Sequence, residues 1–164
     1  MGDVTGSLVT IIGMSFAARF IVLAVVMADQ LTKAWVSDAL RDGPRQLLGP
    51  FRLVLVHNSG AAFGTLGSVT PLLTVLGVAA AVYAWLRAGR RAGWESISWG
   101  LIGGGAAGNV FDRLFRDPGP GWGRVVDFIA IADFPVFNLA DVAVCAGVIL
   151  FALTRMMQPS ESRS

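Results

Sequence analysis

Four apolar runs dominate this sequence, at residues 15–36, 69–86, 97–114 and 137–156, with turn-rich segments between them. Each run has about the length that a helix needs to cross the roughly 30 Å hydrocarbon core of a bilayer. Only 15% of the 164 residues are charged, against about 25% in typical soluble domains. The sequence therefore predicts a mainly α integral membrane protein, a single domain with four transmembrane helices.

The segments outside these runs predict less regular structure. Phe51–His57 alternates apolar and polar residues between Gly/Pro breakers, which is typical of a short strand. A lone strand is unstable, so we expect a small β element over residues 43–66, resting on the helices. The polar tail at 158–164 is expected to be disordered.

Composition excludes several kinds of function. The net charge of +2 comes without any basic run longer than a pair, so no nucleic-acid partner is expected. One histidine and one cysteine cannot form a disulfide or a usual zinc site, and we expect no metal or cofactor. Cys145, inside an apolar run, is interpreted as a small core residue. His57 has no serine or cysteine at a spacing that would suit a catalytic base.

Ionisable residues in or beside the apolar runs are the strongest functional signal. Such a residue costs roughly 2.5–3.5 kcal/mol at the centre of a membrane helix. Asn109, Asp112 and Arg113 are spaced to share one helical face, and we expect Asp112 to be a structural partner of Arg113. Asn138 and Asp141 begin the last run. The pattern predicts a carboxylate site near one membrane boundary.

Other features define this site and its neighbours. The acidic candidates are Asp112, Asp127, Asp133 and Asp141. Two adjoining carboxylates that share one proton can activate water for peptide hydrolysis. Asp29 and Lys33 are spaced as a pair on one helical face; either they belong to the site, or the lysine snorkels into the headgroups. Gly100, Gly104 and Gly108 repeat every four residues, which favours close helix packing.

Five segments in order, DQLTK (29–33), HNSGAAFG (57–64), GNVFDR (108–113), VVDFI (125–129) and FNLAD (137–141), resemble the motifs of lipoprotein signal peptidase, also called signal peptidase II. This family consists of small four-helix aspartic proteases of the bacterial membrane. The resemblance implies that the β element is a β-cradle on the outer surface. It assigns the catalytic dyad to Asp127 and Asp141. Asp133 matches no motif and is expected to be a solvated loop charge.

The resemblance also implies roles for the remaining residues of the motifs. Those expected to hold the substrate backbone or orient the carboxylates are Asn58, Asn109, Arg113 and Asn138, with Asp112, Asp29 and Lys33 in support. The connector at 116–124 is longer than the family usually has. The implied substrate is a prolipoprotein whose lipobox cysteine carries a diacylglyceryl group, cleaved just before that cysteine. Globomycin, a cyclic peptide that inhibits the family, is the implied inhibitor.

Topology follows from the basic residues. Arg87, Arg90 and Arg91 cluster beside an apolar run, which places them in the cytoplasm by the positive-inside rule. Four spans then leave both termini cytoplasmic in the bacterial inner membrane, with the site at the outer face, among membrane lipids. We expect a monomer. Two other classes stay open: a small transporter or proton relay, which would show inverted repeats and acids near the midplane, and a non-catalytic assembly subunit.

Overall fold

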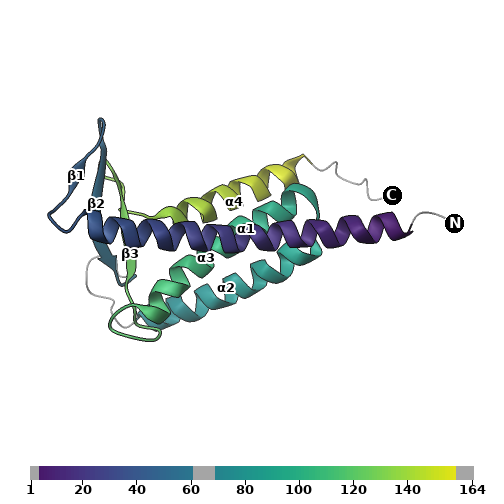
Figure 1. The fold of residues 1–164 in the computed structure, drawn as a ribbon, viewed down its shortest axis with the longest axis horizontal. Coiled ribbons are helices and arrows are strands. Elements are labelled where there is room, and N and C mark those ends of the chain that lie inside the picture. The colour runs from purple at the N-terminus through teal and green to yellow at the C-terminus, as the bar shows by residue number, and fades with distance from the viewer. Residues whose placement is uncertain (1–3, 61–68, 158–164) are drawn as a thin grey trace.

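The computed structural model describes residues 4–60 and 69–157, with residues 4–15 as helical backbone only. Its helices are α1 (Val4–Ala39), α2 (Thr70–Arg90), α3 (Gly93–Phe115) and α4 (Leu139–Met156), and its strands are β1 (Arg45–Gln46), β2 (Phe51–Asn58) and β3 (Val125–Ile131). The helices form an elongated bundle with the sheet across one end (Figure 1). The first residues of α1 and the last of α4 lie at the other end.

Each predicted apolar run coincides largely with one helix, and α1 extends well before residue 15. By length and hydropathy, three stretches of the described helices are able to cross a membrane: Phe16–Ala39, Thr70–Arg90 and Leu139–Met156. The remaining helix, α3, is rich in glycine and contacts each of the other three helices. The protein is thus a mainly α multi-pass membrane protein with a small antiparallel sheet.

The glycine repeat of α3 faces α1, as its spacing indicated. A Cβ on Gly104 would lie 2.6 Å from the Cβ of Val25, and one on Gly108 would lie 2.7 Å from Oδ2 of Asp29. Any larger residue would separate the helices. Gly108 in particular allows α3 to approach a charged group of α1.

The sheet has the order β1-β2-β3, and both pairs are antiparallel. The strand predicted at Phe51–His57 is β2, while residues 61–66 of the expected β element lie outside the described part of the chain, as does the 158–164 tail. Sequence analysis did not assign β3. Its VVDF stretch is buried throughout, and a short continuous apolar run cannot be assigned to strand or helix from periodicity alone. The side chain of Phe128 packs on Val36 and Leu40 of α1, which fixes the sheet on the bundle.

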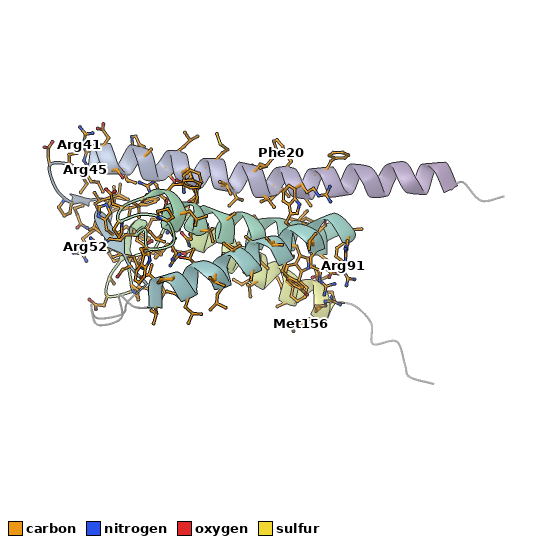
Figure 2. All side chains as sticks on the ribbon, turned by 90° about the horizontal axis from the view of Figure 1, so that it is seen from below. Phe20, Arg41, Arg45, Arg52, Arg91 and Met156 are labelled. Atoms are coloured by element: carbon orange, nitrogen blue, oxygen red, sulfur yellow. The ribbon has the colours of Figure 1, made fainter. Side chains whose placement is uncertain are left out.

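Large apolar side chains cover the outside of the bundle. Phe20 is 70% exposed on α1, Val75 is 64% exposed on α2 and Ile149 is 61% exposed on α4. Figure 2 shows side chains along the whole bundle, with Arg41, Arg45 and Arg52 at the sheet end and Arg91 at the other. Cys145 is also exposed, so its assignment to the core was wrong. In a membrane helix, apolar neighbours in sequence do not show that a residue is buried, because the lipid-facing side is apolar as well.

Candidate functional site

Asp127 lies in the middle of β3, where the sheet meets the helices. Its side chain is 2% exposed. Nδ2 of Asn58, from the neighbouring strand β2, donates to Asp127 Oδ2 at 2.8 Å, and Nδ2 of Asn138 donates to Oδ1 at 2.6 Å. Burial, and secondarily the charge of Asp141, raise the pKa of Asp127 to about 6 despite these hydrogen bonds. A protonated carboxyl is therefore accessible here near neutral pH.

Asp141 is fixed by the start of α4. The three-residue spacing from Asn138 forms a capping box: Asp141 N donates to Asn138 Oδ1 at 3.0 Å, and Asn138 N donates to Asp141 Oδ2 at 3.1 Å. Such a pair satisfies backbone donors that a helix start leaves open. Nδ2 of Asn109, on α3, donates to the other oxygen, Oδ1, at 2.8 Å. The carboxylate thus has one orientation.

Every carboxylate oxygen of Asp127 and Asp141 accepts an N–H, from Asn58, Asn109 or Asn138. An N–H group of this kind cannot accept a proton in return. A proton carried by either aspartate therefore has no acceptor among these partners. It stays available for water or a bound substrate.

Lys33 forms buried ion pairs next to the site. Its Nζ lies 2.8 Å from Asp29 Oδ2 and 2.9 Å from Asp112 Oδ2, and all three side chains are fully buried. The snorkelling alternative for Lys33 is therefore wrong. Asp29 Oδ1 also accepts from the backbone N of Ala140 at 3.0 Å, and Asp112 Oδ2 accepts from the backbone N of Val126 at 3.0 Å. These contacts connect α1 and α3 to α4 and β3.

Lys33 also sets the orientation of Asn109. Asn109 Oδ1 accepts from Lys33 Nζ at 3.1 Å and from Asn138 Nδ2 at 3.0 Å. With two donors on its oxygen, the amide must turn its Nδ2 toward the remaining acceptor, Asp141. A buried lysine on α1 thereby orients a carboxylate on α4.

Asp112 and Arg113 interact through their charges but form no direct ion pair, so the expected pairing is confirmed only at longer range. Asp112 pairs with Lys33 and with Arg116, whose Nε lies 2.7 Å from Asp112 Oδ1. Arg113 instead has a buried Nε without a partner, and its Nη1 donates to the Asn109 carbonyl oxygen at 3.4 Å. Neighbours in sequence point in different directions on a helix, whereas a residue four positions later shares the face.

Sequence reasoning missed two polar residues of this network, Gln30 and Arg116. Nε2 of Gln30 lies 3.1 Å from Asp29 Oδ2, from the Gly108 carbonyl oxygen and from Asp112 Oδ1. The four-residue spacing of Arg116 from Asp112 was a usable signal. For Gln30, the only signal in the sequence was its position next to Asp29.

Two other candidates take no part in the network. His57 and Asp133 are exposed, and neither forms a hydrogen bond or ion pair with Asp127 or Asp141. Within the described residues, no group of three His, Cys, Asp or Glu side chains is arranged to hold a metal ion.

A groove along α4 includes Asp141 in its wall. It has a volume of about 540 Å³ and is lined by Phe134, Phe137, Asp141, Val142, Cys145, Ala146 and Ile149. Asp141 is its charged member, and the wall along α4 is otherwise apolar.

Comparison with known proteins identifies the family. The family model described as signal peptidase (SPase) II matches residues 21–157. The chain belongs to the signal peptidase II family. It is therefore a peptidase, and the matched segment contains both aspartates and every residue that contacts them.

Individual relatives of this signal peptidase II chain extend the match. It is 41% identical over 151 residues to a lipoprotein signal peptidase of Rhodococcus jostii, covering 88% of this chain and 76% of the relative. It is 37% identical over 151 residues to one from Syntrophomonas wolfei, covering 87% and 95%. A solved bacterial membrane enzyme superposes with a TM-score of 0.68 at 26% identity, covering 90% of this chain and 92% of the other.

Proposed function

We propose that this protein is an aspartic endopeptidase that removes signal peptides from diacylglyceryl-modified bacterial prolipoproteins, cleaving just before the lipidated lipobox cysteine. The observation that carries the proposal is the joining of Asp127 and Asp141 through one residue, Asn138. Asn109 bonds Asp141 as well. The family match supports the substrate class.

In the proposed mechanism, Asp127 carries the shared proton and Asp141 is ionised. The raised pKa of Asp127, about 6, favours this assignment. Asp141 takes a proton from water as the water oxygen attacks the scissile carbonyl carbon, while Asp127 donates its proton to the carbonyl oxygen. Collapse of the tetrahedral intermediate returns a proton to Asp127, and the departing amine takes one from Asp141. No side-chain nucleophile is required.

The surroundings fit a substrate presented from the membrane. The groove along α4 would take the apolar part of the substrate, and Asp141 is part of its wall. Asn58 and Arg113 would hold the peptide backbone beside Asp127. A globomycin-type inhibitor would compete by lying between Asp127 and Asp141. The protein would act as a monomer, without a cofactor or nucleic acid.

The proposed location is the bacterial cytoplasmic membrane, with both termini in the cytoplasm and the active site at the outer face. The basic cluster Arg87–Arg91 and the aspartates lie at opposite ends of the bundle, because Arg87 and Arg90 end α2 whereas Asp141 begins α4. The positive-inside rule then favours an outer position for the dyad.

The proposal is tested with purified protein and a synthetic lipobox peptide that carries a diacylglyceryl cysteine. Asp127→Asn and Asp141→Asn should each lower kcat by roughly 10²–10⁴-fold, the range for loss of a general acid or base. Asp133→Asn, a change of an exposed aspartate, serves as the matched control and should cleave normally. Near-normal turnover in either dyad variant would refute the mechanism. A proton relay would cleave nothing in any form.

A further inference from the structure

Arg19 is a charged residue of α1 that the proposed chemistry does not use. Its guanidinium lies against Gly89, the residue before Arg90, where α2 ends. The guanidinium therefore lies toward the end of the bundle opposite the aspartates, the end at which Figure 2 labels Arg91. An ionisable residue at such a place calls for a partner.

The described part of the chain supplies Arg19 with no anion. Its Nε is buried without a hydrogen-bond partner, and no carboxylate among the described side chains forms an ion pair with it. The guanidinium carbon lies 5.5 Å from the ring centre of Trp85 on α2. A Cβ on Gly89 would lie 2.5 Å from an Arg19 nitrogen, so the glycine leaves space for the guanidinium between the helices.

The guanidinium borders a groove on the lipid-facing side of α1 and α2. The groove has a volume of about 770 Å³ and is lined by Phe16, Ala17, Arg19, Phe20, Ile21, Leu23 and Trp85. Arg19 is its charged member, and the aromatic and aliphatic side chains supply the rest of the wall. Phe20 and Leu23 are 70% and 57% exposed. This surface suits an acyl chain that runs down from a headgroup at Arg19.

The end of the bundle near this groove carries more basic than acidic side chains. Arg90, at the end of α2, is exposed and takes part in none of the ion pairs between described residues. Glu95, the carboxylate described at this end, is already shared between Arg91 at 3.4 Å and Arg155 at 3.0 Å. No described acid is left to neutralise Arg19.

We propose that Arg19 and this groove form a binding site for an anionic phospholipid. The lipid phosphate accepts charge-assisted hydrogen bonds from the guanidinium, and one acyl chain lies against Phe16, Phe20 and Leu23. Basic pockets between membrane helices bind anionic headgroups in this way. Trp85 closes the site from α2, as aromatic rings do at headgroup depth. The site is remote from the aspartates and does not depend on the proposed peptidase mechanism.

The test measures binding to delipidated protein in detergent. Phosphatidylglycerol should raise the melting temperature more than phosphatidylcholine, which carries the same phosphate without net charge. Arg19→Gln should weaken phosphatidylglycerol binding by roughly fivefold, the contribution of about one basic residue near an anionic surface. Arg41→Gln, at the opposite end and paired on the surface with Asp38, is the matched control and should bind as the wild type does.

Two further measurements distinguish a lipid headgroup from free phosphate and keep the test valid if Arg19→Gln does not fold. Inorganic phosphate at the same concentration should not reproduce the rise; if it does, the site binds a free anion and the lipid assignment fails. Native mass spectrometry of the wild type should show phosphatidylglycerol retained preferentially over phosphatidylcholine, whether or not Arg19→Gln folds. Equal retention of the two lipids, or unchanged binding by a folded Arg19→Gln, would overturn the proposal.

Discussion

Asn138 joins the two aspartates through different parts of one residue. Its side-chain Nδ2 lies 2.6 Å from Oδ1 of Asp127, and its backbone N lies 3.1 Å from Oδ2 of Asp141. The side chain also caps α4 by accepting from Asp141 N. Asn138 is fully buried, so solvent does not compete for these bonds. Helix capping and the hydrogen bond to Asp127 are therefore separable functions of one side chain.

Asn138→Ser should lower activity far more than stability. Serine retains the capping oxygen, whose loss costs about 0.5–2 kcal/mol, but lacks the amide N–H that reaches Asp127. Asn138→Ala loses both functions and should melt at a lower temperature than Asn138→Ser. Paired melting curves and cleavage rates decide this. If the serine variant cleaves at the wild-type rate, the bridge to Asp127 does not position the dyad.

Lys33→Met should destabilise the protein strongly. It leaves Asp29 and Asp112 buried without their shared cation, and breaking a buried pair costs about 3–5 kcal/mol. Arg41→Gln removes one partner of the exposed Arg41–Asp38 pair and should cost about 0–1 kcal/mol. Thermal melting in one detergent compares the two. Equal melting temperatures would mean that the buried cluster does not hold the bundle together.

The fold was largely predictable from sequence because lipid imposes simple rules on length and hydropathy. The alternation of Phe51–His57 similarly indicated β2. The apolar run around Asp127 has no periodicity that distinguishes strand from helix. Its identity as β3 depends on pairing with β2, a strand distant in sequence, in which Val56 lies opposite Asp127. Motif resemblance selected Asp127 and Asp141 as the candidate pair. Their alignment depends on amide orientations, such as that of Asn109, which no sequence pattern specifies.

Activity should fall as pH rises through about 6, the pKa of Asp127 in the folded protein. If Asp127 must be protonated, this ionisation forms the alkaline limb of a bell in kcat/KM, a limb that belongs to the coupled pair. A profile of cleavage against pH measures it. A rate that climbs steadily from pH 5 to pH 8 would contradict Asp127 as the proton donor.

The same ionisation should make the folded protein less stable as pH rises, whereas ionisation of a salt-bridged aspartate makes a protein more stable. The folded pKa, about 6, lies above the ordinary value of 3.8, so the unfolded chain loses its proton first as pH rises. Stability then falls between about pH 4 and pH 6, by about 3 kcal/mol in total. Melting curves across this window should show the fall in the wild type. Asp127→Asn, which cannot titrate there, should lack this component.

The proposed topology is tested with single cysteines in a Cys145→Ala background. Asp133→Cys and Arg90→Cys each place a thiol at an exposed position, at the sheet end and at the opposite end. In intact cells an impermeant maleimide should label the first, and should label the second only after the membrane is permeabilised. Labelling of Arg90→Cys alone in intact cells would invert the orientation.

Cys145 provides a last test, of the groove that leads to Asp141. It is the one cysteine of the chain, it is exposed, and it lines the groove together with Phe137 and Asp141. The proposed chemistry uses no thiol, so Cys145→Ala should cleave normally. A bulky, lipid-soluble maleimide on Cys145 should nevertheless block cleavage, because the adduct fills the path to Asp141. Globomycin added first should slow the labelling. If the fully labelled wild type cleaves at its normal rate, the substrate approaches the aspartates from another side.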